Sequence, residues 1–419
     1  MKNKIKIYIL LYIQIIAYLY GYYAPKNITN SGNSSTRIKQ TYRFDQIPDD
    51  GSYTLSVEDI SGNIKLKGHE GSGAKLIITR IAHGIPEGEI EEVHKLARSF
   101  ITHSEDEELV IISGEEKKQN EDHIESIFEL EFPKNVNLNI KLIGGDIDIY
   151  GINGEGIFET KGGDISIELY KGRLDAITDG GEINIKNTEG IIRAHSLGSD
   201  LRVIDLRGEI YLSSIGGNID LDQVNGTTDV QVTGGSINLS NIEGGKIGCR
   251  TSGGPIKGEN MSGIISMKSS GSDIEVSDMD GEISLMTSGG HIIIDSLVGS
   301  LVCEASSGNI DMKKIIGSVD CLTSAGDIEL ELIYDSFIKE KSIHMETHLG
   351  DAIINIPEGL AGNIKSTIYQ ASSEKDLNSE IPLLINIDEK KVTGEGMVGG
   401  GTVPINIEVY NGSITIKQD

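Results

Sequence analysis

The chain has 419 residues, with 37 Lys and Arg against 64 Asp and Glu, which gives a formal net charge of −27. This balance argues against nucleic acid or an anionic membrane surface as the main partner. Glycine supplies 52 residues, tryptophan is absent and aromatic residues make up only 5%, so the core must be built from aliphatic side chains.

The N-terminal segment has the pattern of an export signal. Three lysines within the first six residues precede an apolar run over residues 7–24. Residues 1–24 are therefore predicted to be either a cleaved signal peptide or an uncleaved anchor through which residues 7–24 could attach the chain to a membrane. Both predict export to the periplasm, the outer surface or the extracellular space. Residues 25–41, rich in Asn, Ser and Thr, are predicted to be a flexible linker.

Residues 42–143 are predicted to form a β-rich N-terminal cap. Strand-like segments at 53–57 and 75–79 precede residues 86–100, where an initial proline and apolar residues at helical spacing predict one short helix. Residues 62–66, Gly-Asn-Ile-Lys-Leu, copy once the repeated unit described next. This copy indicates a solenoid that begins there and is interrupted.

A glycine-led unit recurs from Gly144 onward at steps of 18 residues, with one step of 19. Copies begin at Gly144, Gly162, Gly180, Gly198, Gly216, Gly234, Gly253, Gly271, Gly289, Ser307 and Ala325. The fourth and sixth places are aliphatic, as in Ile147 and Ile149, and this period of two is typical of a strand. A looser second strand follows half a unit later, and the double glycines are expected at a corner that needs positive φ or a backbone without Cβ crowding.

These features predict an all-β fold, a right-handed, two-sheeted parallel β-solenoid with 18 residues per coil over residues 144–333. Identical side chains one coil apart should stack, so Ile165 should lie between Ile147 and Ile183 in the interior. After Tyr334 the period is lost, although units near Gly350 and Gly412 echo it. Residues 334–419 are therefore predicted to be a C-terminal β cap.

The order of these segments resembles the bacterial "putative adhesin" family of β-strand-repeat envelope proteins. The resemblance covers residues 42–419 and rests on Ser61-Gly62-Asn63-Ile64, the short acidic helix, Phe132-Pro133-Lys134, the Gly-Gly-Asp-Ile units and Asn411-Gly412-Ser413-Ile414. It implies an exported, non-enzymatic β-helix. It supplies no catalytic or ligand residues.

Two files of polar residues recur with the repeat. The first is acidic and outward, and comprises Asp146, Asp164, Glu182 and Asp200. We interpret it as a solvated face, with weak divalent-cation association as the alternative, since the unit lacks the glycine and aspartate of calcium-binding β-rolls. The second file carries hydroxyls near the corner, at Thr160, Thr178, Ser196, Ser214, Thr251, Ser269, Thr287 and Thr323. Hydrogen bonds to turn amides are the favoured interpretation, and ice or glycan binding is the alternative.

Three cysteines occupy the same inward place of the second strand, Cys249, Cys303 and Cys321. Cys303 and Cys321 should stack; we expect buried free thiols, with a disulfide between these two as the alternative. The segment from His344 to His348 departs from the His-Glu-x-x-His pattern of zinc proteases, so both histidines are expected at the surface, about 13 Å apart along a strand.

The sequence therefore predicts a non-enzymatic exported cell-envelope protein, an adhesin or structural surface protein. No catalytic, cofactor-binding or metal-binding residue is assigned, and no cofactor is expected. The expected partner is a surface protein or glycan, not nucleic acid. The alternative is a polysaccharide-processing enzyme on a β-helix, a class that usually has longer coils and loops to build a cleft.

Overall fold

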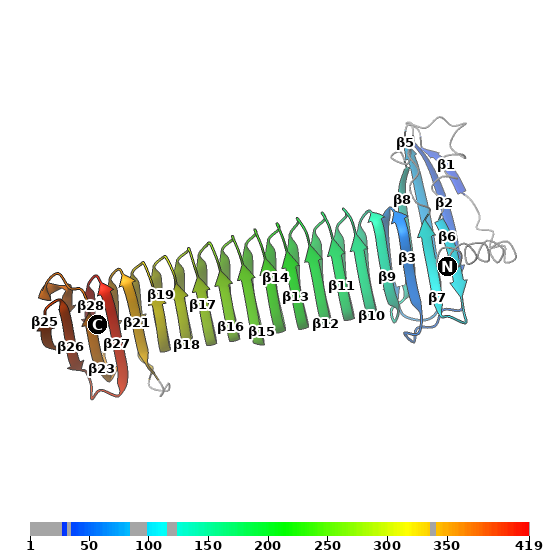
Figure 1. Cartoon of the computed structure of the whole chain (residues 1–419). Coiled ribbons are helices and arrows are strands. Elements are labelled where there is room, and N and C mark those ends of the chain that lie inside the picture. Colours follow the sequence, from blue (N-terminus) through cyan, green and yellow to red (C-terminus); the bar gives the residue numbers. More distant parts are fainter. Residues whose placement is uncertain (1–26, 32–34, 84–98, 115–123, 336–340, 419) are drawn as a thin grey trace, which may run out of the picture. The chain divides into compact units, whose positions relative to one another are not determined.

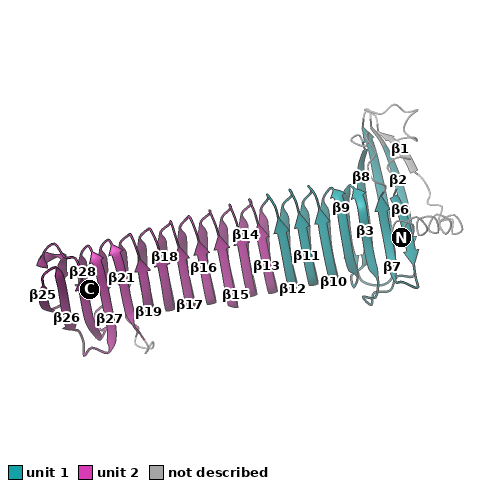
Figure 2. Cartoon of the chain, in the orientation of Figure 1, with its two compact units in different colours: residues 1–199 teal, residues 200–419 magenta. Residues whose placement is uncertain are grey.

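The computed structural model describes residues 27–31, 35–83, 99–114, 124–335 and 341–418. The predicted signal or anchor, residues 1–24, lies outside these ranges. The chain forms two compact units, residues 1–199 and 200–419 (Figure 2).

The coils of unit 1 are long parallel strands, labelled in Figure 1: β10 (Ile147–Thr160), β11 (Ile165–Thr178) and β12 (Ile183–Ser196). Ile147 pairs with Ile165, which pairs with Ile183, and all three side chains are buried. The predicted stacking of identical side chains one coil apart is therefore confirmed, and with it the β-solenoid. Alternate residues of each strand point inward, because successive side chains of a strand point to opposite faces.

Unit 2 continues the same pattern. Its coils are β13 (Leu201–Ser214), β14 (Ile219–Val232), β15 (Ile237–Thr251), β16 (Ile256–Ser269), β17 (Ile274–Thr287), β18 (Ile292–Ala305) and β19 (Ile310–Thr323). Each pairs in parallel with the next. The extra residue of the 19-residue step is absorbed in β15, where the register with both neighbours shifts after Glu243.

Each coil turns at two corners. At the first corner one residue is left-handed, such as Leu169 (φ 57°) and Asn187 (φ 52°), and the parallel pairing skips it. Asn or Asp, which tolerate this conformation, occupy the corner in five of the ten coils from β10 to β19. Glycine follows three residues later, as at Gly172 (φ 132°). The second corner is the turn that carries the double glycines.

The coil before β10 is built from two separate strands, β4 (Asn63–His69) and β9 (Asn137–Gly144). Both pair in parallel with β10, and Ile64 lies beside Ile147. The prediction that the solenoid begins near residue 62 and is interrupted is confirmed: the chain between these two strands is an insertion into one coil.

The N-terminal cap completes unit 1. Beyond β4 and β9 lie the parallel strands β3 (Thr54–Ser61), β7 (Leu109–Gly114) and β8 (Ile124–Pro133), then the antiparallel strands β5 (Ala74–His83), β6 (Ser99–Ser104), β2 (Ser35–Phe44) and β1 (Asn27–Ser31). Antiparallel hairpins thus cover the open end of the parallel stack.

Two expectations for this region need correction. Residues 25–41 are not a tether throughout, because β1 and β2 pair with each other and β2 pairs with β5 along its whole length. The polar composition of residues 25–41 contains one apolar anchor, Ile38, which is buried, and Phe44 at the end of β2 is buried as well. Of the predicted helix 86–100, residues 99 and 100 belong to strand β6, and the rest lies outside the described residues.

The C-terminal end of unit 2 keeps the solenoid register past residue 334. β20 (Ile328–Leu332) and β21 (Ile343–Leu349) both stack on β19; β22 (Ala352–Ile356) follows β20, β27 (Val403–Asn411) follows β21, and β28 (Ile414–Gln418) follows β22. The apparent loss of period comes from insertions, as the echoes at Gly350 and Gly412 suggested.

The insertion before β27 closes this end. It contains β23 (Gly362–Ile368), β24 (Leu377–Ser379), β25 (Leu384–Asp388) and β26 (Lys391–Met397), with a 3-10 turn at Glu374–Asp376. β23 continues the parallel stack on β27, whereas β26 and β25 follow as an antiparallel hairpin. In the part of the chain that the structure describes, we find no helix long and apolar enough to cross a membrane.

Candidate functional surfaces

The acidic file is a ladder of hydrogen bonds between coils. In unit 1 the amide of Asp164 donates to Asp146 Oδ1 at 3.0 Å, and the amide of Glu182 donates to Asp164 Oδ1 at 2.8 Å. In unit 2 the amide of Asn218 donates to Asp200 Oδ1 at 2.7 Å. These carboxylates point outward as predicted, and one oxygen of each acceptor is used by the next coil.

Asp164→Ala should lower the free energy of unfolding by about 1 kcal/mol, because the amide of Glu182 loses its acceptor. Asp164→Asn should retain most of the stability, since Asn218 performs the same role at 2.9 Å from the amide of Ser236. Urea unfolding followed by circular dichroism measures both. Equal losses in the two variants would show that the charge, and not the acceptor, matters.

The hydroxyl file is buried, which contradicts the alternative of ice or glycan binding by these residues. All eight members are at most 4% exposed. Thr178 Oγ1 donates to the Gly163 carbonyl at 3.0 Å and accepts from the amide of Gly181 at 3.0 Å. The favoured interpretation, hydrogen bonds to turn groups, is confirmed. Thr178 joins the turn that follows it, at Gly181, to the turn of the preceding coil, at Gly163.

Thr178→Val should lower the free energy of unfolding by about 2 kcal/mol, because a buried carbonyl and a buried amide both lose their partner. Thr178→Ser is the matched control: it keeps the hydroxyl, as Ser196 does one coil later. Thermal unfolding of the two variants should separate them. A valine variant as stable as the serine variant would contradict this role.

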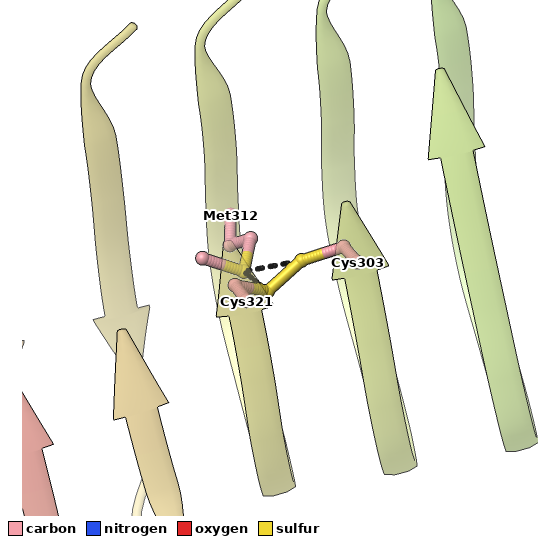
Figure 3. Close-up of a disulfide and its surroundings, with 3 residues drawn as sticks. All are labelled: Cys303, Met312 and Cys321. Carbon is pink, nitrogen blue, oxygen red and sulfur yellow. Dashed lines mark hydrogen bonds between the residues drawn. A yellow bond between two sulfur atoms is a disulfide. The ribbon is translucent and has the colours of Figure 1, made fainter. Parts of the chain in front are cut away.

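The cysteines share one interior ladder, but two of them are joined. Cys303 pairs with Cys321 in the register, and the two form a disulfide with Cα atoms 4.6 Å apart (Figure 3). Met312 Sδ lies 3.5 Å from Cys321 Sγ and 4.0 Å from Cys303 Sγ. The expectation of free thiols is therefore wrong for this pair, because stacking one coil apart already brings both side chains within bonding reach. Cys249 is free and buried, and burial raises the pKa of its thiol.

The two histidines of the His344–His348 segment lie at the surface, as predicted, but closer together than predicted. His348 Nε2 is 2.9 Å from Glu346 Oε1, and His344 Nε2 is 3.7 Å from Glu346 Oε2. Both rings lean towards the carboxylate between them, which an extended-strand estimate does not capture. Among the described residues, no group of three or more His, Cys, Asp or Glu is arranged to hold a metal ion.

An aromatic row crosses neighbouring strands beside this segment. The rings of Tyr369 and Tyr410 stack with centroids 4.5 Å apart, His348 meets Tyr410 edge-on, and Lys391 lies over Tyr369. Tyr369 donates to Glu408 at 2.9 Å, and this hydrogen bond raises the pKa of Tyr369 to about 12. Each of the two tyrosine rings therefore already contacts two protein groups.

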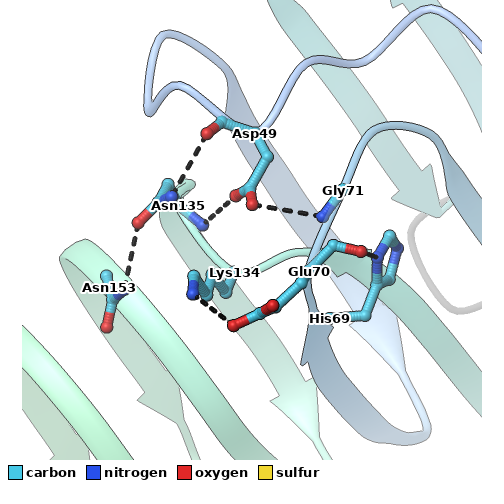
Figure 4. A network of polar contacts seen from close by, with 7 residues as sticks. All are labelled: Asp49, His69, Glu70, Gly71, Lys134, Asn135 and Asn153. Atoms are coloured by element: carbon cyan, nitrogen blue, oxygen red, sulfur yellow. Dashed lines mark hydrogen bonds and ion pairs between the residues drawn. The ribbon is translucent and has the colours of Figure 1, made fainter.

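A polar network fastens the N-terminal cap to the first coils (Figure 4). Asp49 Oδ1 accepts from the amide of Asn135 at 3.0 Å, and Asn153 Nδ2 donates to Asn135 Oδ1 at 3.0 Å. Lys134 pairs with Glu70 at 2.8 Å, and their hydrogen bond lowers the pKa of Glu70 and raises that of Lys134. These contacts are internal, so we assign the network a structural role.

A long groove crosses the outer face of the coils in unit 2. Its volume is about 600 Å³ and it crosses the coils from β13 to β18. Two files of outward side chains form its walls. They are the fifth and the seventh places of each repeated unit, on either side of the inward sixth place. The first wall is Arg202, Asp220, Asn238, Lys257, Glu275 and Ile293. The second wall is Ile204, Asp222, Ser240, Glu259, Ser277 and Asp295.

The groove has dimensions and chemistry suited to a linear chain. Its walls stand two residues apart on a strand, about 6.6 Å, and its length over five coil steps is about 24 Å. Several polar groups already pair along the walls: Lys257 with Glu275 at 2.8 Å, and Ser240 with Asp222 at 2.9 Å. The repeat of donors and acceptors, one set per coil, can contact a polymer at regular intervals.

Unit 1 has a groove of about 390 Å³ on the same face of its own coils, from β5 and β8 to β11. Its walls include Lys65, Lys67 and Tyr150, and Lys67 Nζ lies 5.9 Å from the centre of the Tyr150 ring. These two wall files were not predicted from the sequence. Their signal was available, because the outward fifth and seventh places alternate with the inward isoleucines.

The register, the buried ladders and the covering hairpins define a parallel β-solenoid protein whose groove faces outward. No family model matches the chain, and no curated protein matches it. A solved structure described as a putative cell adhesion protein from Clostridium sporogenes is similar over 91% of this chain and 100% of its own, at 9% identity and a TM-score of 0.17. At these values the likeness supports neither the fold nor a function.

Proposed function

We propose that the chain is a non-enzymatic, exported cell-envelope protein, an adhesin or structural surface protein, that presents its solenoid groove to a surface protein or glycan. The groove of unit 2 carries this proposal, because a regular groove about 24 Å long, with polar side chains along both walls, suits adhesion to a linear chain.

Two further observations support export. The disulfide between Cys303 and Cys321 fits an oxidising compartment such as the periplasm or the exterior of the cell. The lysine-led apolar run over residues 7–24 fits a signal peptide or anchor. The resemblance of residues 42–419 to the adhesin family agrees with both.

The test combines localisation with binding. Surface labelling of intact cells and N-terminal sequencing of the mature chain establish export and cleavage. Binding of the purified protein to host or sibling cells and to glycan arrays should then fall with Glu259→Lys, which reverses a charge in the groove. Glu282→Lys, the same change on an exposed strand residue that does not line the groove, is the matched control. Equal binding by both variants would contradict the groove as the adhesive surface.

The alternative, a polysaccharide-processing enzyme, makes a different prediction for the same groove. Several carboxylates and two cations, Arg202 and Lys257, line it, which are the residue types that such chemistry uses. A panel of acidic polysaccharides incubated with the purified protein decides between the two. Turnover that is lost with Lys257→Ala would establish the enzyme and overturn the proposal.

A further inference from the structure

The C-terminal cap ends in an exposed strand edge. β25 (Leu384–Asp388) is the outermost strand of this cap in Figure 1, and among the described residues it pairs only with β26. All five of its residues are exposed, with Leu384 at 77%, Ile385 at 47% and Ile387 at 50%. An apolar strand with one free edge is the kind of element that proteins usually shield or use for pairing.

The apolar face of β25 continues the core of the cap. Ile385 lies opposite Gly394 and Ile387 opposite Val392, and Val392 is only 2% exposed. One strand further in, Ile368 pairs with Val392 and is fully buried. The row of core side chains thus continues to the edge of the sheet, where its last members, Ile385 and Ile387, are about half exposed to solvent.

We propose that the free edge of β25 pairs with β25 of a second copy of this chain, antiparallel and centred on Asn386. In this register Ile385 faces Ile387 of the other copy, and the reciprocal pair forms as well. The contact is therefore self-complementary, as a two-fold interface requires. The four isoleucines would extend the core row across the joined sheet, where apolar cross-strand pairs are stabilising.

The charges of the β25 edge allow a second copy of this acidic chain to bind there without like-charge repulsion. The chain carries a net charge of −27, yet Asp388 is the one charged residue of β25. In the proposed register Asp388 faces Leu384 of the other copy, so like charges do not oppose each other across the contact. The residue opposite Asp388 on the neighbouring strand of the hairpin is a lysine, Lys391.

The size of the contact predicts a weak dimer. A five-residue strand with three apolar side chains on each copy buries less than the roughly 1,600 Å² of a standard stable interface. Association should therefore appear at high local concentration, such as that of many copies on one surface. The inference does not rest on the proposed adhesion, since it concerns the cap and not the groove.

Cysteine cross-linking tests the register directly. In Asn386→Cys the two new thiols should lie opposite each other, and mild oxidation should give a covalent dimer on a non-reducing gel that reductant removes. Asp388→Cys is the control: its two thiols would stand about 13 Å apart along the strands, too far for a disulfide. Dimer in the first variant and its loss in the second is the expected result. Equal cross-linking, or none in either variant, would overturn the proposal.

Sedimentation of the full chain gives a second measurement. The average mass of the wild type should rise with concentration, and the double variant Ile385→Lys and Ile387→Lys should lose this rise. Because both side chains are half exposed, the melting temperature should change little and confirm that the variant is folded. A concentration dependence that survives the double variant would place the contact elsewhere and overturn the assignment.

Discussion

Gly172→Ala is expected to lower the free energy of unfolding by roughly 3 kcal/mol. Gly172 has φ 132°, a region that residues with a Cβ rarely adopt, and an added Cβ would overlap the carbonyl oxygen of Gly154 in the preceding coil. Neither problem can relax locally, because the neighbouring backbone is held in the parallel ladder on both sides. Urea unfolding monitored by circular dichroism measures the loss.

Gly162→Ala is the matched control for this prediction. Gly162 belongs to the double-glycine turn, but its Cβ would meet no atom within 4 Å. Ser307 and Ala325 occupy the equivalent place in later coils, so a side chain is already accepted there. The control should change stability by less than about 0.5 kcal/mol. Similar losses in both variants would mean that general turn flexibility, and not the close approach at Gly172, governs the effect.

This pair also shows which glycines the sequence could identify. The double glycines drew attention because they lead each unit, and Gly145 does have positive φ. The glycine at the other corner is the more regular one: it recurs at Gly154, Gly172 and Gly190, with φ from 132° to 153°. Composition alone cannot distinguish a glycine that needs its conformation from one that fills space, because the distinction depends on the neighbouring coil.

The register of the solenoid could be predicted from the sequence because one side-chain class recurs at one spacing. Ile147, Ile165 and Ile183 occupy the same place in successive units. Because the side chains of a strand alternate between two faces, only one register of neighbouring coils places all three in the interior. The single copy of the motif at Ile64 was informative for the same reason.

The burial of the hydroxyl file was harder to predict than the exposure of the acidic file. Thr178 and Asp164 recur equally well, yet one is buried under a turn and the other exposed at its surface. A hydroxyl and a carboxylate can both accept from a turn amide, so residue type leaves the partner open. The groove could not be predicted for another reason. The residue types of its walls vary from coil to coil, and only their positions repeat.

Removal of the disulfide is expected to have an effect as large as that at Gly172. The double variant Cys303→Ala and Cys321→Ala opens a loop of 18 residues, for which the chain-entropy model gives about 3 kcal/mol. Both cysteines are buried, so reductant should act on the unfolded and not on the folded chain. Wild-type unfolding in urea should therefore shift to lower concentration when reductant is present, and the double variant should show no such shift.

Cys249→Ala is the control that separates the effect of losing the disulfide from the effect of removing side-chain volume from the core. Cys249 lies on the same interior ladder and is free, so its truncation should cost only about 1 kcal/mol and leave the response to reductant intact. Thiol titration in urea without reductant provides an independent count: one reactive thiol per chain is expected, that of Cys249. Three thiols would mean that Cys303 and Cys321 remain reduced, and the support that their bond gives to export would then be lost.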